Sequence, residues 1–388
     1  MIVQLGDVIQ KILGNEDRLT TEREFYVGGE HFISGNLEVK QRGIIKNEDL
    51  GYQFHFPFEC GDVLFMTKNP RLRKAGRADF SGICSIATFV IRTKSELVLS
   101  QDFLPVIFQS DDFWDYLIAN QSGSVNPFIK WGTLEKYTFN LPDISVQNHY
   151  CKIIWDLQEL INTLEKHSSL LDQLVKSRFI EMFGRVKTNE KNLQKTTLNQ
   201  ICKSIVDGSH NPAKGGEKSD YLMLSSKNIV DNVITYEDPR YLSKEDFDSE
   251  NKRTQVKPGD ILMTIVGTIG RTAIVPVNAG NITFQRSVAV LHLDESIVNS
   301  IFVKYCIDSI QADIDSEAHG SSQKGIYLNQ VEKIPVLVPS MSLQREFASF
   351  VEQVDKSRFE LQRHLENTRK LQKALINQAF KERTHHDT

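Results

Sequence analysis

Two stretches of the chain decide its organisation: LPDISVQ at Leu141–Gln147 and VPSMSLQ at Val338–Gln344. Their proline, serine and glutamine align when the second stretch is shifted back by 197 residues. The register then holds without a gap as far as Phe183 in the first copy and Phe380 in the second. A match at a fixed long offset indicates an internal duplication. The 388 residues therefore contain two copies of one unit.

A long helix is predicted after each of the two prolines, Pro142 and Pro339. Both segments lack proline, carry apolar residues at steps of three, four and seven, and place Ser145 or Ser342 where an N-cap would lie. The helices are expected over 144–184 and 341–383, each roughly 60 Å long at 1.5 Å per residue. One small domain cannot cover so long a stripe, so the spacing favours two helices packed as an antiparallel coiled coil. The alternative is two separate helical hairpins, each folded back on its own domain.

The region before each helix has a different pattern. Short β-branched and aromatic runs, broken by Gly, Asn and Pro, predict strands at Val63–Phe65, Thr88–Ile91, Ile261–Val266 and Ser287–Leu291. The predicted fold class is α+β, with two mixed α/β domains in a pseudo-twofold arrangement, joined by the two long helices. The expected boundaries are 1–143 for the first domain, 144–184 for its helix, 185–340 for the second domain, 341–383 for its helix and 384–388 for a tail.

Composition narrows the protein class. The chain is 40% hydrophobic and 25% charged, which excludes a mostly disordered protein. Five scattered cysteines form no C-x-x-C pair, which favours a reducing compartment. No apolar run is long enough to span a membrane, so a cytoplasmic protein is expected. The net charge of −4 is not typical of an isolated nucleic-acid binder.

Motifs of the common enzyme classes do not occur in the sequence. It has no P-loop, no G-x-S-x-G elbow, no H-E-x-x-H and no glycine-rich loop for S-adenosylmethionine. His167 and His364 occupy the same helical position in the two copies, and we interpret them as core or interface residues. We predict no catalytic residue and no metal site.

An ordered set of strings, present in duplicate, resembles the specificity (S) subunit of type I restriction-modification systems over essentially the whole chain. In the first copy these strings are Tyr26–His31, Gly61–Phe65, Asn69–Lys74, Ser122–Ser124, Trp131 and Leu141–Gln147. In the second copy they are Asp207–Pro212, Gly259–Leu262, Gly267–Arg271 and Val338–Gln344.

The resemblance implies two target recognition domains, each reading one half of a split double-stranded DNA sequence, with helices that fix the gap between the halves. It implies no catalytic activity and no cofactor in this chain. Two modification subunits, which hold S-adenosylmethionine and methylate adenine, would dock on it. Two restriction subunits would add ATP- and Mg-dependent translocation and cleavage.

Polar and basic loops supply the candidate DNA-binding residues, because duplex recognition needs phosphate contacts for register and base contacts for sequence. In the first domain the candidates are Lys68, Asn69, Arg71, Arg73, Lys74, Arg77, Ser122, Ser124, Asn126 and Lys130. In the second they are His210, Asn211, Lys214, Lys218, Arg271, Gln285, Arg286, Ser321, Ser322, Gln323 and Lys324. The two sets differ so much that an asymmetric target is expected.

The ends of the helices supply candidates for partner docking: Phe179, Phe183, Ile376 and Phe380. Local packing under the recognition domains is the alternative for these four side chains. Three other functions stay open: a specificity subunit whose partner combines methylation and cleavage in one chain, a coiled-coil scaffold, and a bifunctional enzyme with a nuclease site.

Overall fold

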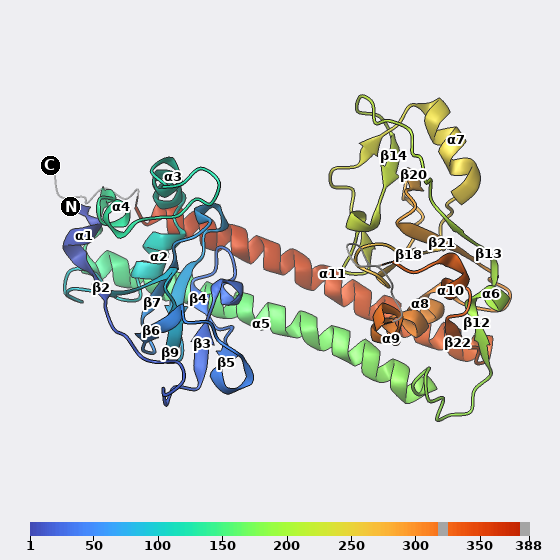
Figure 1. Cartoon of the computed structure of the whole chain (residues 1–388), viewed down its shortest axis with the longest axis horizontal. Coiled ribbons are helices and arrows are strands. Elements are labelled where there is room, and N and C mark those ends of the chain that lie inside the picture. The colour runs from blue at the N-terminus through green and yellow to red at the C-terminus, as the bar shows by residue number, and fades with distance from the viewer. Residues whose placement is uncertain (317–324, 381–388) are drawn as a thin grey trace. The chain divides into compact units, whose positions relative to one another are not determined.

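The computed structural model describes residues 1–316 and 325–380, which belong to two compact units. Unit 1 comprises Met1–Lys166 and the chain from Leu361 onward, and unit 2 comprises His167–Glu360. Each of the two long helices, α5 (Ile144–Phe183) and α11 (Met341–Gln378), contributes one part to each unit (Figure 1). The candidates Ser321, Ser322, Gln323 and Lys324 lie outside the described residues.

Unit 1 contains two main sheets and a short ribbon. One sheet has the order β2-β10-β7-β8-β4 and the other β5-β3-β9-β6, while β1 pairs with β11. The strands are β1 (Ile2–Gln4), β2 (Ile9–Ile12), β3 (Phe25–Val27), β4 (Glu38–Val39), β5 (Gly43–Ile44), β6 (Phe54–Phe58), β7 (Val63–Met66), β8 (Ala75–Ala78), β9 (Gly82–Ser85), β10 (Thr88–Thr93) and β11 (Thr138–Asn140). The short helices are α1 (Leu5–Val8), α2 (Leu104–Gln109), α3 (Asp111–Ala119) and α4 (Trp131–Glu135).

Unit 2 has sheets β13-β21-β18-β19 and β17-β14-β20, with the pairs β12-β22 and β15-β16. The strands are β12 (Lys195–Thr197), β13 (Cys202–Asp207), β14 (Tyr221–Leu224), β15 (Ile229–Val230), β16 (Val233–Ile234), β17 (Arg240–Tyr241), β18 (Ile261–Thr264), β19 (Thr272–Ile274), β20 (Asn281–Phe284), β21 (Val288–Leu293) and β22 (Pro335–Leu337). The short helices are α6 (Leu198–Ile201), α7 (Lys244–Thr254), α8 (Ser300–Asp308), α9 (Gln311–Ser316) and α10 (Leu328–Val331).

The sequence duplication is also a duplication of topology. In unit 1 the antiparallel neighbours β10, β7 and β8 follow the same order as β21, β18 and β19 in unit 2. The parallel pair β3·β9 corresponds to β14·β20, and the ribbon β1·β11 to β12·β22. Both units are mixed α/β structures, so the predicted fold class is confirmed for each unit.

The glutamine shared by the two opening stretches anchors the start of each long helix. Gln147 is fully buried and donates from Nε2 to the carbonyl oxygens of Val98 (2.9 Å) and Pro142 (2.8 Å). Gln344 is equally buried and donates to the carbonyl oxygen of Pro339 (2.9 Å). A buried amide retains its position only when its polar atoms are satisfied, so each glutamine fixes the chain where its helix begins.

The serines near these glutamines are not N-caps, contrary to the sequence expectation. Helix α5 begins at Ile144 and α11 at Met341, so Ser145 and Ser342 lie one residue inside their helices. The first-turn backbone bonds of the two helices reach the carbonyl oxygens of Asp143 and Ser340 instead.

The two copies share a G-D-[VI]-L motif, at Gly61–Leu64 and Gly259–Leu262. Its aspartate closes the turn that precedes β7 or β18. Asp62 and Asp260 follow glycines with positive φ, a conformation that favours glycine. Asp62 Oδ2 accepts from the backbone N–H of Glu59 (2.8 Å), and Asp260 Oδ2 accepts from that of Lys257 (2.6 Å). Both carboxylates are buried. The repeated motif is therefore a structural turn.

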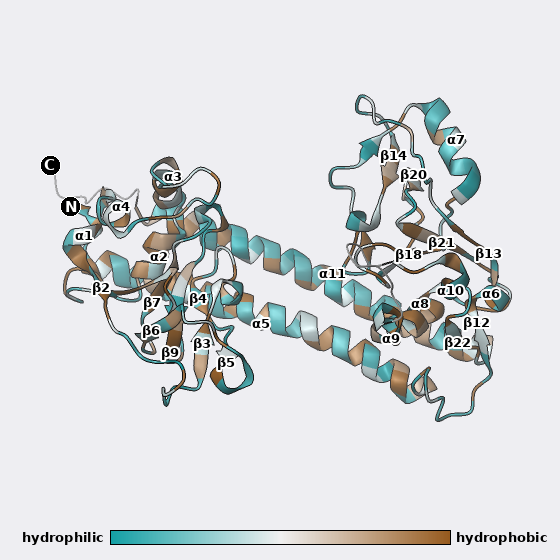
Figure 2. Ribbon diagram, in the orientation of Figure 1, coloured by the Kyte–Doolittle hydropathy of each residue, from teal (hydrophilic) through white to brown (hydrophobic). Residues whose placement is uncertain are grey.

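Helices α5 and α11 run antiparallel within each unit. As the residue number rises along α5 it falls along α11, and the hydrophilic and hydrophobic residues of both helices are interspersed along their length (Figure 2). The antiparallel packing predicted from the sequence is thus confirmed in both units. The contacts in chain order along α5 are Gln158–Gln372 and Glu165–Arg369 in unit 1, and Asp172–Arg358 and Arg178–Glu346 in unit 2.

Only part of the apolar stripe predicted for α5 is buried. Leu160 and Leu174 are 44% and 48% exposed, whereas Ile154, Ile161 and Val175 are buried. Apolar residues occur on two adjacent faces of this helix, and steps of three and four can be drawn through either. The histidines of the repeat, His167 and His364, are exposed, so their interpretation as core or interface residues was wrong.

The four predicted docking side chains belong to the two hydrophobic cores. Phe179 and Phe183 pack against Phe302 of α8 in unit 2. Ile376 is buried in the unit 1 core, and Phe380 is half-buried there, with its ring centroid 5.6 Å from that of Phe103. Phe179, Phe183 and Ile376 have no free surface for a partner, and the contacts of all four side chains favour local packing, the alternative.

Candidate nucleic-acid interface

The basic run of unit 1 forms the turn between β7 and β8. Asn69 adopts a left-handed conformation (φ 52°), a short 3-10 turn follows at Pro70–Leu72, and Arg73 is left-handed again (φ 48°). Asparagine tolerates this region better than most residues, which fits the first position. The sequence prediction of a loop is confirmed, and we name residues Lys68–Lys74 the first recognition loop.

The second polar segment of unit 1 is hydrogen-bonded to that loop. The N–H of Asn69 donates to the carbonyl oxygen of Pro127, and the N–H of Ile129 donates to that of Thr67, both at 2.9 Å. Tertiary structure therefore brings together two segments that are about sixty residues apart. The predicted candidates that lie exposed on this edge are Lys68, Asn69, Arg71, Ser124, Asn126 and Lys130, while Ser122 is half-buried.

Three of the five basic side chains in the run have partners inside unit 1. Arg73 forms an ion pair with Asp111, and the ammonium of Lys74 donates to the carbonyl oxygen of Gly29 (2.6 Å). Arg77 forms an ion pair with Asp102. The prediction treated all five as available for DNA, but charge in a sequence does not show which partners folding supplies. Lys68 and Arg71 are the two that remain exposed.

Unit 2 assembles its candidate residues around the end of β20. The N–H of Ser209 donates to the carbonyl oxygen of Phe284 (3.1 Å), and the N–H of Arg286 donates to that of Ser209 (3.0 Å). Gly208 makes this approach possible, because a Cβ there would lie 1.9 Å from the Phe284 oxygen. We name this combination of 209–218 with Gln285 and Arg286 the second recognition edge.

Side chains of the second recognition edge are exposed to different degrees. Asn211, Lys214, Lys218 and Arg286 are exposed, and Gln285 and Arg271 are half-buried. His210 is exposed but held by the carboxylate of Asp207 (2.7 Å), which also pairs with Arg253 of α7. The sequence did not single out Arg253, because nothing in its own neighbourhood indicates that it lies beside Asp207.

Both units share one backbone contact in the loop that follows the G-D-[VI]-L strand. In unit 1 an isolated bridge joins Lys68 to Phe128, and in unit 2 the corresponding bridge joins Val266 to Gly325. Each bridge links the loop after a G-D-[VI]-L strand to the segment before the last short helix of the repeat. This contact of the loop after the G-D-[VI]-L strand is thus duplicated in backbone, while the side chains around it differ.

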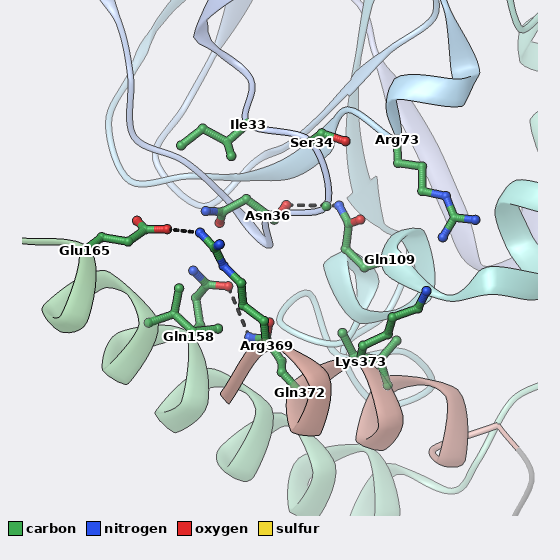
Figure 3. Close-up of a pocket in the computed structure, with 13 residues that line it drawn as sticks. Ile33, Ser34, Asn36, Arg73, Gln109, Gln158, Glu165, Arg369, Gln372 and Lys373 are labelled. Carbon is green, nitrogen blue, oxygen red and sulfur yellow. Dashed lines mark hydrogen bonds and ion pairs between the residues drawn. The ribbon is translucent and has the colours of Figure 1, made fainter. Parts of the chain in front are cut away.

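A cavity of about 370 Å³ lies in unit 1 beside the first recognition loop, between residues 33–36 and the paired helices (Figure 3). Arg73, Arg369 and Lys373 line it. Each of these cations has a carboxylate partner, since Arg369 pairs with Glu165 while Arg73 and Lys373 share Asp111. Across residues 1–316 and 325–380, no group of three or more metal-ligating side chains occurs, and no helix is both long and apolar enough to cross a bilayer.

The pKa of the Asp111 carboxyl group, beside this cavity, is shifted strongly from its ordinary value. Burial opposes its ionisation, but hydrogen bonds from Arg73, Asn377 and Lys373 outweigh that effect and lower the pKa of Asp111 to about 2. A carboxylate with a lowered pKa stabilises the folded state above its unfolded pKa near 4, and the contribution is lost as the pH falls towards 2.

We therefore expect Asp111→Asn to lower the free energy of unfolding by about 1–2 kcal/mol at pH 7, after allowing for partial exposure. The difference from the wild type should shrink between pH 4 and pH 2. Urea unfolding of both proteins across this range measures it. Asp112→Asn, at the exposed neighbouring position, is the control and should have little effect. A difference that does not depend on pH would contradict the electrostatic explanation.

Comparisons with known proteins give a consistent picture. Residues 182–369 match the family model described as type I restriction modification DNA specificity domain. The chain is 28% identical to the Escherichia coli type I restriction enzyme EcoBI specificity subunit over 191 residues, which cover 48% of this chain and 39% of that relative. It is 22% identical to the putative type I restriction enzyme MjaX specificity subunit of Methanocaldococcus jannaschii, covering 86% of this chain and 80% of the relative.

A solved structure shows the same fold. The S subunit of the type I restriction-modification system from M. genitalium superimposes with a TM-score of 0.55 at 12% identity, over 99% of this chain and 96% of that one. At this identity the likeness concerns the fold alone.

Proposed function

We propose that the chain is the DNA sequence-recognition subunit of a type I restriction-modification complex, because residues 182–369 match the specificity-domain model and the similar proteins are specificity subunits of such systems. Each unit reads one half of a bipartite double-stranded DNA target, and the paired helices set the gap. The observation that carries this proposal is the duplicated loop after the G-D-[VI]-L strand, with the same backbone contact and different side chains in each copy. A protein with two related readers suits two half-sites on one duplex.

The side chains of the two edges suit the two kinds of contact that DNA recognition requires. Lys68 and Arg71 are flexible exposed cations on unit 1 and are suited to phosphates. Asn126, Gln285 and Arg286 are of the residue types that make paired hydrogen bonds to adenine or guanine in the major groove. The net charge of −4 does not oppose this function, since formal charge averages over the whole chain and both edges carry exposed cations, such as Lys68 and Arg286.

The target is an asymmetric sequence in this proposal. The first edge carries a basic loop with a 3-10 turn, whereas the matching segment of unit 2 is the glycine-containing turn at Gly267–Gly270. Different side chains in equivalent positions read different bases. Single-molecule sequencing of methylated adenines in host DNA tests the function. A split motif with two different halves is expected, and a perfect palindrome, or no motif that depends on this gene, would overturn it.

Catalysis and cofactors belong to the partners in this proposal, and the chain itself is non-catalytic. Two modification subunits would bind S-adenosylmethionine and methylate adenine, and two restriction subunits would use ATP and Mg. A system in which one partner chain both methylates and cleaves is the alternative. Co-purification of the tagged chain with the products of neighbouring genes separates the two arrangements.

Exposed leucines of α5 replace the buried phenylalanines as docking candidates for a modification subunit. Leu170 and Leu174 are both 48% exposed and lie one turn apart on the same face of the helix. We expect Leu170→Asp combined with Leu174→Asp to reduce co-purification of the modification subunit at least tenfold, while the circular dichroism spectrum stays unchanged. Ser169→Asp, which adds charge at an exposed neighbouring position, is the matched control. Full recovery of the complex with the double variant would contradict docking on this face.

A further inference from the structure

We propose that Arg73 and Arg77 are positioning residues, which attach the first recognition loop to the two long helices and leave Lys68 and Arg71 to contact DNA. The inference rests on the proposed function and deepens it, because it assigns different roles to arginines that are neighbours in the sequence. It also reverses the expectation that every cation of the run is a DNA ligand.

The attachment to α5 is made by Arg77 of β8. Its guanidinium lies 4.2 Å from the ring centroid of Trp155 on α5 and forms an ion pair with Asp102. The indole Nε1–H of Trp155 donates to the carbonyl oxygen of Asp102 at 3.0 Å. Arg77 of β8, Trp155 of α5 and Asp102 therefore each contact the other two. To reach a phosphate, Arg77 would have to give up both the stacking and the ion pair.

The attachment to α11 is made by Arg73 through Asp111. The backbone N–H of Asp111 donates to Oδ1 of Asn377 (3.0 Å), and Nδ2 of Asn377 donates back to Oδ2 of Asp111 (2.8 Å). The ammonium of Lys373 lies 3.2 Å from Oδ1 of Asp111. Arg73 and Lys373 extend towards the same side of the cavity, one from the loop and one from the helix (Figure 3).

Two cations of the loop, Lys68 and Arg71, differ from Arg73 and Lys74 because they have no such contacts. Lys68 and Arg71 are exposed, and no side-chain hydrogen bond or ion pair to either is found within residues 1–316 and 325–380. A cation that is exposed and unpaired can approach a phosphate without losing a protein contact first. The basic run from Lys68 to Arg77 thus contains the two arginine anchors, one lysine bonded to a backbone carbonyl oxygen, and two free cations.

Unit 2 does not repeat this attachment. Asp308, which aligns with Asp111, accepts from the hydroxyl of Thr272 on β19 and from the ammonium of Lys304, and no arginine among residues 1–316 and 325–380 pairs with it. Glu352 occupies the position that aligns with Trp155. The arginine anchors are therefore specific to unit 1, and loosening them should affect only the half-site that unit 1 reads.

Loss of an anchor should change the discrimination between correct and altered half-sites more than it changes the overall attraction to DNA. Base contacts require side chains held to within a fraction of an ångström, whereas attraction to phosphates depends mainly on the number of cations nearby. A correct base contact contributes about 1–3 kcal/mol of discrimination, so a loosened loop should lose roughly tenfold in preference for the correct half-site.

The experiment uses the full chain in complex with its modification subunit and three duplexes: the mapped target, and that target with either half altered. Fluorescence anisotropy gives affinities over a range of salt concentrations. We expect Asp102→Asn and Asp111→Asn to reduce discrimination at one and the same half-site by at least fivefold. Discrimination at the other half-site and the salt dependence should be unchanged. Both variants remove negative charge, so simple electrostatics would predict tighter binding instead.

Two arginine variants complete the test. Arg77→Lys keeps the charge but loses the stacking, and it should behave like Asp102→Asn. Arg71→Gln, the matched control, should weaken binding to all three duplexes equally and reduce the slope of log affinity against log salt by about 0.9. The inference is overturned if Arg77→Lys and Asp102→Asn leave discrimination intact. If the wild-type complex itself shows no sequence preference, the proposed function has failed instead.

Discussion

Replacing Phe183 by alanine should lower the free energy of unfolding by about 3–5 kcal/mol. The ring is fully buried at the end of α5, with its centroid 4.8 Å from that of Phe302 and 5.6 Å from that of Phe347. Removing it deletes buried apolar area and leaves a cavity among aromatic rings that are themselves fixed by their neighbours. Denaturant unfolding of the full chain measures the effect.

A variant on the exposed face of the same helix provides the control. Leu174→Ala removes a half-exposed side chain and should change the free energy of unfolding by less than about 1 kcal/mol. The comparison also separates the two interpretations of Phe183 considered from the sequence. If Phe183→Ala left stability unchanged and instead abolished binding of the modification subunit, the ring would be a docking residue and the assignment to the core would be wrong.

Replacing His292 by leucine should destabilise the chain by about 3–5 kcal/mol, because it leaves a buried carboxylate without its partner. Nδ1 of His292 lies 2.9 Å from Oδ1 of Asp260, and Nε2 lies 2.8 Å from the carbonyl oxygen of Thr254. Both side chains of the Asp260–His292 pair are largely buried. In unit 1 the equivalent carboxylate, Asp62, is paired with Arg92.

The double variant Asp260→Asn with His292→Leu tests this explanation. The asparagine keeps an oxygen for the N–H of Lys257 but carries no charge, so the cost of an unpaired ion disappears. We expect the double variant to be more stable than His292→Leu alone, by at least 1 kcal/mol in a double-mutant cycle. Simple additivity of the two substitutions would show that the ionic partnership contributes little, and that packing accounts for the loss.

The elements of the fold were largely predictable from local sequence. Strands β7, β10, β18 and β21 coincide with the β-branched runs, and the proline-free segments form α5 and α11. The repeated glutamines and aspartates could be seen to matter, because each recurs at the same place in both copies. Their role, as buried groups that satisfy backbone atoms, depends on carbonyl and amide groups that local sequence does not place.

The candidate site was predictable only in part. Local composition correctly placed polar loops at Lys68–Lys74 and before α4, but it could not show that Asn69 bonds to Pro127. Nor could it distinguish Arg71 from Arg73, because the partner of Arg73 is Asp111, which lies far along the chain. Spacing also could not show which apolar residues of α5 are buried, because two apolar faces satisfy the same spacing and packing selects one of them.

The sequence alone therefore determined the duplication and the two long helices, because repeats and periodicity are properties of the chain itself. Only the tertiary structure decided which cations are free and which are anchors, and which apolar residues form the cores. Those properties depend on partners that are distant in sequence: Trp155 for Arg77, Asp111 for Arg73, and Phe302 for Phe183. Burial and pairing are relations between segments, and they exist only once the segments have packed.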